Sequence, residues 1–395
     1  MKKFIVFLLL LIPINVFALD LDITSSNAIM YNLNDNEVIY EKGSEEEVSI
    51  ASLTKIMTCI VAIENIDNLD DKVILTNKDF ESLAEQNAAV AGFHVGEEVT
   101  YRDLLYGLML PSGADAAQAL ERVTYGGRDK FIDAMNEKVK KLKLKHTHFT
   151  NPTGLDEDGH YSSAEDLSKI FMYALKNDTF KEIITTSTYT TSNGRLTFRS
   201  TISKALSNYN LDMKYLLGGK TGTTENAGLC LATIAEYDGV KYLLVTIKAP
   251  MGNAIPSNYS DQKIIYDYFM NNYSYKEIVK KNDVLVKIDT LYAKSDKVTI
   301  KSNKTIKKYL DNTFDKNKVH YKYDGIKKIK YNTKVGTTLG KVKIIYNDEV
   351  LDTINVKLDE KLEFDFIKYL SSHKLIIIIC SSCLLILLVF IRRKR

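Results

Sequence analysis

The sequence predicts an α/β (α+β) domain, followed by a small all-β domain and a C-terminal membrane helix. Three observations support this order: a hairpin pattern precedes several helical patterns, strand patterns return after position 195, and the composition changes after about position 273. The chain has 395 residues, of which 45% are hydrophobic and 26% are charged, so it is long enough for two globular domains plus targeting segments. Its formal net charge of +3 is too small to indicate binding to nucleic acid.

Residues 1–18 have the pattern of a secretory signal peptide. Two lysines precede an apolar run at residues 4–12, and Val16 and Ala18 stand three residues and one residue before the expected cleavage point. We expect cleavage after Ala18, because the apolar run is shorter than the roughly 20 residues that an uncleaved membrane anchor needs. The remaining chain is therefore expected to be exported.

The first domain is expected at residues 19–272. Residues 27–40 alternate around an Asn/Asp turn, which is typical of a β-hairpin. Residues 52–65 are apolar on almost every side, so we expect them to form a helix that is buried at the centre of the domain. Helical patterns also cover residues 101–110, 114–122, 128–142 and 163–175, strand patterns cover 229–235 and 241–247, and a last helix covers about 260–271. This order implies one sheet that combines strands from both ends of the segment.

A small β-rich domain is expected at residues 273–365. Residues 274–360 contain 20 Lys, no Arg and 12 Asp plus Glu, with short alternating stretches. We interpret this cationic segment as a spacer that holds the first domain away from the membrane, or as a docking surface for anionic wall polymer or lipid head groups.

Residues 375–391 are predicted to form a single transmembrane anchor. The apolar run is interrupted only at residues 380–383, and four cations follow it at residues 392–395. Its length lies at the short end of the spanning range of about 17–25 residues, and the cations favour a cytoplasmic C-terminus. An amphipathic surface helix is the alternative, but residues 384–391 show no polar face. We therefore expect a single-pass protein of the cell membrane with both domains outside the cytoplasm.

Two cysteines lie outside the anchor, Cys59 and Cys230. The sequence allows a disulfide between them, because an exported protein can be oxidised. We favour two free thiols, because Cys59 lies in the apolar helix. We expect no metal and no other cofactor: cysteine pairs with metal spacing are confined to the anchor, and His146 and His148 have no obvious third ligand nearby. We expect His160 to support the loop before the helix at 163–175.

The segment Ser52-Leu-Thr-Lys55 places a hydroxyl and an amine on one face at the start of the buried helix. A serine becomes a good nucleophile only when a neighbouring base takes its proton. A lysine is such a base when burial or another cation lowers its pKa. The alternative interpretation, an ordinary helix-capping serine, would hold if nothing else in the chain agreed.

Two further segments agree with the nucleophile interpretation. Ser112 lies between two helical runs and is a candidate for relaying protons to a leaving amine. A Lys-Thr-Gly-Thr segment lies just before a predicted strand, and it offers a second cation and hydroxyls for a substrate carboxylate, with a glycine that lets a ligand backbone approach closely. The residues of this segment are Lys220, Thr221, Gly222 and Thr223.

The three motifs occur in the order that is typical of penicillin-binding proteins and class A β-lactamases. Over about residues 24–272 the chain resembles the low-molecular-mass penicillin-binding proteins that are serine-type D-alanyl-D-alanine carboxypeptidases. The resembling blocks are residues 50–58, 104–117, 149–155 and 219–222. The resemblance implies a penicillin-binding/β-lactamase-like transpeptidase domain, with an antiparallel sheet flanked by helices.

The resemblance also implies a function. The enzyme would remove the terminal D-Ala from peptidoglycan stem pentapeptides through an acyl-enzyme on Ser52, and β-lactams would be covalent inhibitors. The backbone N–H groups of Ser52 and Thr223 would form the oxyanion hole.

The chain departs from the family pattern at two points. Ala114 stands where the family triplet normally has asparagine, so an amide that orients Lys55 and the substrate is missing. In addition, residues 222–391 contain no arginine to hold the substrate carboxylate. That role is left to Lys220, Thr221 and Thr223, with Lys248 as a further possibility.

Two alternatives stay open. A class A-like β-lactamase would share the motifs and would need a deacylating glutamate, for which Glu157 and Glu165 are candidates. A weakly active wall-binding protein is suggested by Ala114 and the cationic β-rich domain, although the joint presence of Ser52, Lys55 and the later motifs argues against it.

Overall fold

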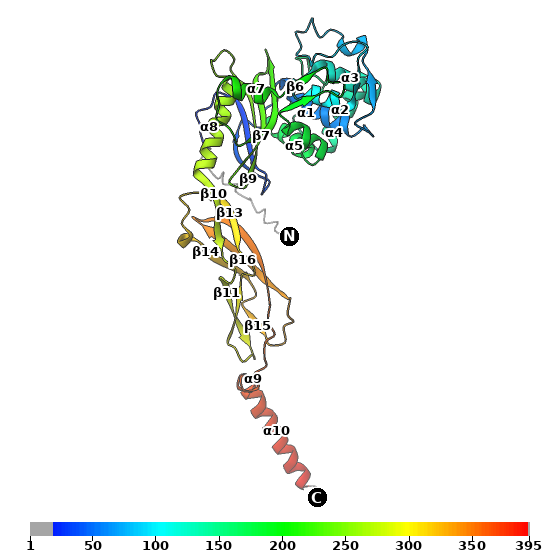
Figure 1. Cartoon of the computed structure of the whole chain (residues 1–395). Helices are drawn as coiled ribbons and strands as arrows, with labels where there is room; N and C mark the ends of the chain where they lie inside the picture. The colour runs from blue at the N-terminus through cyan, green and yellow to red at the C-terminus, as the bar shows by residue number, and fades with distance from the viewer. Residues whose placement is uncertain (1–18, 394–395) are drawn as a thin grey trace, which may run out of the picture. The chain divides into compact units, whose positions relative to one another are not determined.

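The structure is a computed structural model of the chain and describes residues 19–393. The predicted signal peptide lies outside the described residues. The described chain divides after Tyr268 into two compact units, each with its own hydrophobic core (Figure 1).

The centre of the first unit is a five-stranded antiparallel sheet with the strand order β2-β1-β9-β8-β7. Its strands are β1 (Asn27–Asn32), β2 (Glu37–Lys42), β7 (Leu216–Thr224), β8 (Gly228–Tyr237) and β9 (Val240–Ala249). The N-terminal hairpin joins the C-terminal strands through β1 and β9, where Ile29 lies opposite Val245. The prediction of an antiparallel sheet that combines both ends of this segment is thereby confirmed. Strand β7 forms the edge of the sheet away from the hairpin.

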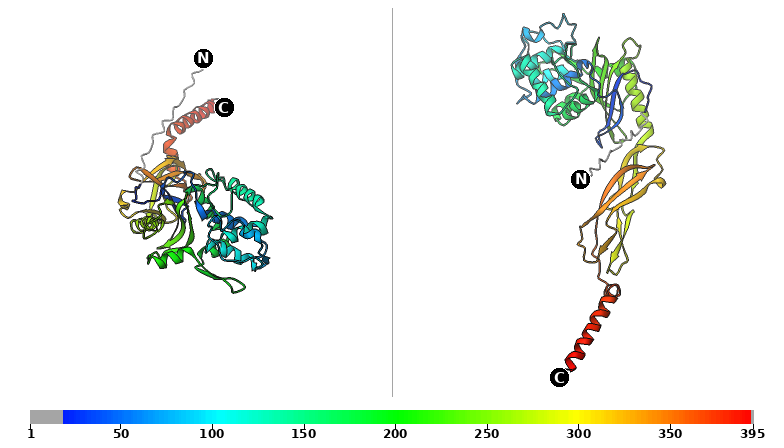
Figure 2. Two further views of the ribbon diagram at one scale, coloured as in Figure 1. Left: turned by 90° about the horizontal axis from the view of Figure 1, so that it is seen from above. Right: turned by 180° about the vertical axis from the view of Figure 1, so that it is seen from behind.

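Helices cover both faces of this sheet, with α1 to α5 on one side and α8 on the other (Figures 1 and 2). The helices are α1 (Thr54–Ile63), α2 (Tyr101–Met109), α3 (Ala114–Tyr125), α4 (Arg128–Lys141), α5 (Ala164–Ala174), α6 (Asp178–Thr185), α7 (Thr201–Asn208) and α8 (Ser257–Asn272). Two short antiparallel pairs join β3 (Lys72–Ile74) to β4 (Glu98–Thr100) and β5 (Thr188–Thr190) to β6 (Thr197–Arg199).

Helix α1 is buried over its whole length, because its side chains are apolar on nearly every side and α2 to α6 all pack against it. A turn of 3-10 helix, η1 (Ala51–Leu53), leads into it. Cys59 of α1 and Cys230 of β8 are both buried free thiols. The buried helix therefore fixes the position of the η1 turn at its N-terminus.

The helix starts show the capping that the sequence suggests. Thr100 Oγ accepts a hydrogen bond from the Asp103 N–H, and the Asp103 carboxylate accepts one from the Thr100 N–H. Ser163 Oγ accepts from the Asp166 N–H in the same way at the start of α5. Such bonds satisfy N–H groups that have no partner within the helix, and they fix where α2 and α5 begin.

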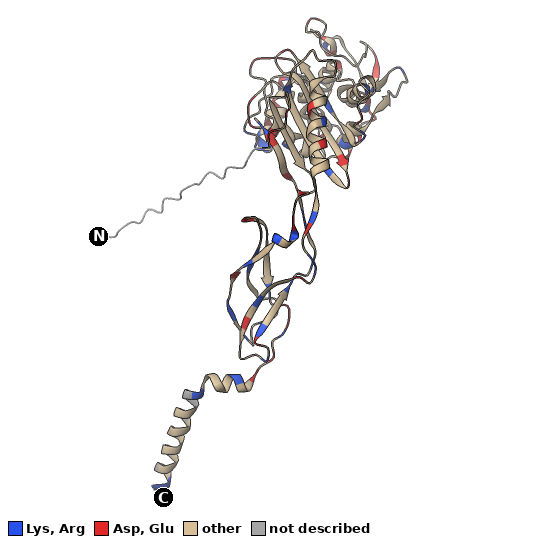
Figure 3. Ribbon diagram, turned by 90° about the vertical axis from the view of Figure 1, so that its left-hand side faces the viewer, with Lys and Arg blue, Asp and Glu red and all other residues tan. Residues whose placement is uncertain are grey.

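The second unit consists largely of strands. They are β10 (Tyr273–Val279), β11 (Val284–Leu291), β12 (Lys297–Lys301), β13 (Ile306–Asp311), β14 (His320–Gly325), β15 (Lys328–Lys330), β16 (Thr338–Tyr346) and β17 (Glu349–Lys357). Strand β16 shows why they form: Val342 and Ile344 are fully buried, while Lys341 and Lys343 between and beside them are exposed. Cations and anions are spread along these strands (Figure 3).

Two helices follow, α9 (Phe366–Ser372) and α10 (Lys374–Arg393). Within residues 19–393, no helix combines the length and the apolar character that crossing a membrane requires. The predicted membrane helix at residues 375–391 falls on α10, and this finding does not support it.

Candidate active site

Ser52 lies in η1, directly before the buried helix, and Lys55 lies one turn later in α1. Lys55 Nζ donates a hydrogen bond to Ser52 Oγ at 3.0 Å and a second one to the backbone oxygen of Thr153 at 2.6 Å. The Lys55 side chain is only 2% exposed, and Ser52 is half-buried. The serine is therefore partly exposed while its neighbouring amine is enclosed.

Burial lowers the pKa of Lys55 to about 7, although the nearby Asp115 carboxylate raises it in part. A lysine with this pKa carries a substantial neutral fraction at neutral pH, and a neutral amine can accept the proton of a serine hydroxyl. The pair has both the geometry and the protonation behaviour of a nucleophile with its base.

A second pair of the same kind lies at the edge of the sheet. Lys220 of β7 is fully buried, and its Nζ donates to Ser112 Oγ at 2.8 Å and to the backbone oxygen of Thr221 at 2.7 Å. Burial, and then the charge of Lys55, hold the pKa of Lys220 well below its ordinary value. The Lys55 charge thus acts on Lys220, which shows that the two pairs lie close enough to interact electrostatically.

Strand β7 also closes on the turn that carries Ser52. A Cβ at Gly222 would lie 3.1 Å from the Ser52 nitrogen and 3.1 Å from Ala51 Cβ, so only glycine fits here without displacing η1. Thr221 Oγ donates to Thr201 Oγ at 2.9 Å, and Thr223 is exposed on the same strand. The structure thus brings the serine, both lysines and the Lys-Thr-Gly-Thr strand to one place.

Ser112 and Ala114 stand at the entrance to α3. Ser112 has a φ of 68°, a left-handed conformation that costs a non-glycine residue energy and that is common at functional sites. The N–H of Ala114 donates to the backbone oxygen of Ala89, and the methyl side chain is 1% exposed. The position therefore offers no side-chain polar group to the site.

Sequence reasoning did not single out Asp115. Its buried carboxylate accepts hydrogen bonds from the backbone N–H groups of Ala91, Gly92 and Phe93 and so holds that loop to the start of α3. It is also a charge that acts on Lys55. Its place in the first turn of α3 was the only available signal, since acidic residues are common there.

The loop at residues 151–154 contacts Lys55, and in the sequence it stands out only as part of the resembling block at residues 149–155. Asn151 Oδ1 accepts from the N–H groups of Thr153 and Gly154 at 3.1 and 2.7 Å, which fixes the Thr153 carbonyl toward Lys55. Gly154 has a φ of +79°, and a Cβ there would lie 2.0 Å from the Ala51 oxygen.

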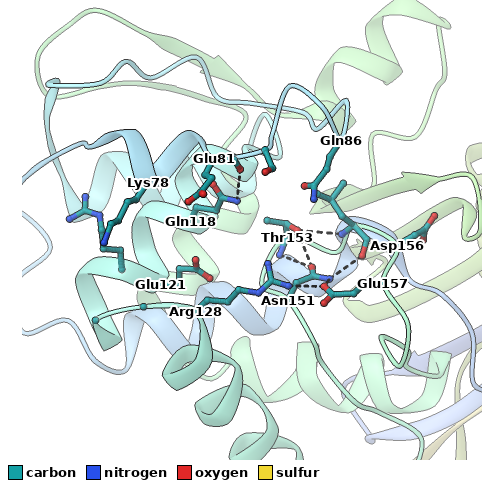
Figure 4. A pocket seen from close by; sticks show the side chains of 15 residues that line it. Lys78, Glu81, Gln86, Gln118, Glu121, Arg128, Asn151, Thr153, Asp156 and Glu157 are labelled. Atoms are coloured by element: carbon teal, nitrogen blue, oxygen red, sulfur yellow. Dashed lines mark hydrogen bonds and ion pairs between the residues drawn. The ribbon is translucent and has the colours of Figure 1, made fainter.

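The outer side of this loop lines a cavity of about 470 Å³. Gln118 and Glu121 of α3 face Asn151 and Thr153 across it (Figure 4). Burial raises the pKa of Glu121 to about 7, with Arg128 opposing the shift. The cavity and the Lys55 site therefore share one wall.

The remaining candidates lie elsewhere or are engaged by other residues. Glu157 pairs with Arg128 at 2.7 Å, and Glu165 pairs with Lys169 at 2.9 Å. Lys248 is exposed on β9. The His146 ring nitrogen lies 3.4 Å from Glu47.

Comparison with known proteins gives a consistent result. Residues 15–251 match the model of the D-alanyl-D-alanine carboxypeptidase family, peptidase S11. The chain is 28% identical to the D-alanyl-D-alanine carboxypeptidase DacF of Bacillus subtilis, over 86% of each chain. It is 34% identical to a D-alanyl-D-alanine carboxypeptidase of Streptomyces sp. strain K15, over 60% of this chain and 84% of the relative.

Solved structures agree. The Streptomyces K15 DD-transpeptidase has a TM-score of 0.57 at 33% identity and covers 62% of this chain and 97% of its own. The carboxypeptidase DacD of Francisella tularensis, at 20% identity, has a similar fold over 88% of this chain and 95% of its own, with a TM-score of 0.67.

Proposed function

Because the chain belongs to the D-alanyl-D-alanine carboxypeptidase family of serine hydrolases, peptidase S11, we propose that it releases the terminal D-Ala from peptidoglycan stem peptides through an acyl-enzyme on Ser52. The main support for Ser52 as the nucleophile is its 3.0 Å hydrogen bond with Lys55 Nζ. Burial lowers the pKa of this amine to about 7, so it can act as the base.

The reaction begins when neutral Lys55 takes the proton of Ser52 and the serine oxygen attacks the carbonyl carbon of the D-Ala-D-Ala peptide bond. The new C–O bond forms, and the carbonyl oxygen becomes negatively charged. The C–N bond then breaks, and the proton that Lys55 took is relayed through Ser112, whose hydroxyl is bonded to Lys220, to the leaving amine of D-Ala, so that Lys55 is neutral again. Water next attacks the ester carbonyl while Lys55 takes one of its protons. The ester C–O bond then breaks, Lys55 returns this proton to the Ser52 oxygen, and the shortened peptide leaves.

The developing negative charge is stabilised by the backbone N–H groups of Ser52 and Thr223. The close approach of Gly222 to the Ser52 nitrogen supports this proposal, since it sets two backbone segments side by side. Preorganised N–H donors of this kind typically contribute about 10²- to 10³-fold in rate.

The free carboxylate of the substrate is held by Lys220, Thr221 and Thr223 on β7. Without an amide at Ala114, one polar contact to the substrate is missing, which costs on the order of 1–3 kcal/mol. We expect an active enzyme that turns over more slowly than one with asparagine at this position.

The cyclic amide of a β-lactam presents the same carbonyl and carboxylate, so penicillin acylates Ser52. The protein acts on the cell wall, outside the cytoplasm. We further propose that residues 375–391 anchor it as a single-pass protein, on the strength of their apolar sequence and the four cations that follow. Recovery of the full chain in the membrane fraction, and of a chain ending at residue 365 in the soluble exported fraction, tests this anchor.

The enzymatic proposal is tested with a diacyl-D-Ala-D-Ala peptide and labelled penicillin, using the protein beside Ser52→Ala. We expect free D-Ala and long-lived penicillin labelling, both absent from the variant. Rapid penicillin hydrolysis without release of D-Ala would indicate a β-lactamase instead. Absence of labelling would contradict the enzymatic proposal and leave the wall-binding alternative.

A further inference from the structure

A buried histidine lies behind the turn that carries Ser52. His160 is 7% exposed, and its ring packs edge-to-face against Phe149. Its Nε2 lies 2.8 Å from Thr54 Oγ, and its Nδ1 lies 3.2 Å from the backbone nitrogen of Thr150. Both ring nitrogens therefore have partners inside the protein.

These partners determine which nitrogen carries the proton. The backbone N–H of Thr150 is a donor, so Nδ1 must accept, and a neutral imidazole then carries its proton on Nε2. Nε2–H donates to Thr54 Oγ, which leaves the Thr54 hydroxyl proton for the backbone oxygen of Ala51, 2.9 Å away. Burial lowers the pKa of His160 to about 4, with Glu157 opposing the shift, which agrees with a neutral ring.

This series of hydrogen bonds ends at the peptide bond between Ala51 and Ser52, whose N–H belongs to the proposed oxyanion hole. The carbonyl of Ala51 and the N–H of Ser52 belong to one planar trans peptide and point in opposite directions. A bond that fixes the Ala51 oxygen therefore also fixes the direction of the Ser52 N–H, whose nitrogen would lie 3.1 Å from a Cβ at Gly222 of β7.

The turn needs this restraint because its conformation is unfavourable. Ala51 has a φ of 47°, and an alanine in the left-handed region is destabilised by roughly 1–2 kcal/mol. Gly154 confines the Ala51 oxygen from one side, and this oxygen accepts hydrogen bonds from both the backbone N–H and the hydroxyl of Thr54.

We propose that His160 and Thr54 are positioning residues for the oxyanion hole, acting through the hydrogen-bond chain His160 Nε2–H, Thr54 Oγ–H and Ala51 oxygen. The inference rests on the proposed function, which assigns the oxyanion to the Ser52 N–H. Neither side chain touches the substrate. Their loss slows acylation and leaves the first, non-covalent binding of the ligand unchanged.

The test uses His160→Phe, which keeps a flat ring without a donor, Thr54→Val, which removes the hydroxyl, and the double variant. Rapid mixing with labelled penicillin gives the acylation rate constant and the dissociation constant of the initial complex separately. We expect each single variant to acylate about 10-fold more slowly, a partial loss of the oxyanion contribution. The double variant should acylate at most about twofold more slowly than either single variant, because both changes interrupt the same series of hydrogen bonds.

Two matched variants accompany the test. His160→Gln keeps a side-chain N–H that can donate to Thr54, and it should retain the acylation rate within about threefold. His148→Gln changes an exposed histidine nearby, whose Nδ1 lies 2.8 Å from the Gly159 oxygen, and should acylate like the unmodified protein. Unchanged acylation in Thr54→Val, multiplicative losses in the double variant, or a loss confined to the dissociation constant would each overturn the inference.

A second measurement does not depend on activity. Nitrogen-15 NMR of the histidine rings of the protein should show His160 as a neutral ring protonated at Nε2 from pH 6 to 8. A ring protonated at Nδ1 would contradict the inference even in a fully active enzyme. Failure of the unmodified protein to acylate would contradict the proposed function instead, and the two outcomes are thus distinct.

Discussion

Lys220 Nζ donates a hydrogen bond of 2.8 Å to Ser112 Oγ, although 108 positions separate the two residues in the sequence. The lysine comes from the edge strand of the sheet, and the serine comes from the turn before α3. Burial holds the pKa of Lys220 well below its ordinary value. We propose that this bond, which joins the edge strand to the turn before α3, is part of the path by which protons cross the site.

Replacing Ser112 tests this path. We expect Ser112→Ala to slow acylation by labelled penicillin about 100-fold, the usual contribution of a positioned proton donor. Ser112→Gly should be equally slow but more stable than Ser112→Ala by about 1 kcal/mol, since glycine adopts the φ of 68° without strain. Stopped-flow acylation and urea unfolding give the two quantities. A fast Ser112→Gly variant would exclude the serine from proton transfer.

Acylation should depend on pH through Lys55. Its pKa is lowered to about 7, and it acts as a base only when neutral, so the rate constant should rise with pH up to about 7 and level off above it. The acylation rate measured between pH 5.5 and 9 checks this. Lys55→Arg, which stays charged, should be inactive throughout. A rate that falls as pH rises through 7 would mean that the protonated lysine is the active form.

Gly154 provides a test of the contact behind the nucleophile. In Gly154→Ala the new Cβ would meet the Ala51 oxygen at 2.0 Å, so the turn must move. We expect a loss of about 3 kcal/mol in the free energy of unfolding and little acylation. Gly194→Ala is the control, because its φ of +72° gives similar strain while no atom lies within 4 Å of the new Cβ. Equal effects in both variants would show that backbone strain, rather than the contact, is responsible.

Glu121 should make stability depend on pH. Burial raises its pKa from 4.5 to about 7, and its Oε2 has no hydrogen-bond partner among the described residues. The unfolded chain loses this proton first, so stability falls as pH rises from about 4.5 to 7 and stays lower above. Glu121→Gln should therefore gain on the order of 2 kcal/mol at pH 8 and nothing near pH 4. Urea unfolding of both proteins at pH 4 and at pH 8 measures this gain in stability. An equal gain at the two pH values would rule out ionisation of Glu121 as the cause.

The parts of the site that follow from local spacing could be read from the sequence. Ser52 and Lys55 are three positions apart, and any helix start brings such residues to one face. The alternation of residues 27–40 predicted the hairpin, and the short apolar runs at 229–235 and 241–247 predicted central strands, which are apolar along their length because helices cover both faces of the sheet. These signals need no knowledge of the tertiary structure.

Other features depend on how distant segments meet. The carbonyl of Thr153 reaches Lys55 only because Asn151 turns the loop toward α1. The strained φ of Ala51 carries no residue-type signal, since alanine normally avoids that conformation. Asp115 looked like an ordinary first-turn acid, and its influence on Lys55 arises from packing. The direction of these backbone groups and the burial of these side chains depend on the tertiary structure, and a local sequence pattern does not contain that information.

The central claim is that Ser52 forms the covalent intermediate with Lys55 as its base. The most direct measurement is mass spectrometry of the protein after brief exposure to penicillin, with peptide mapping of the adduct. We expect one penicilloyl group per chain on the peptide that contains Ser52, and none in Ser52→Ala or in Lys55→Arg over the same time. An adduct on any other residue, or a full adduct in Lys55→Arg, would contradict this account of the site.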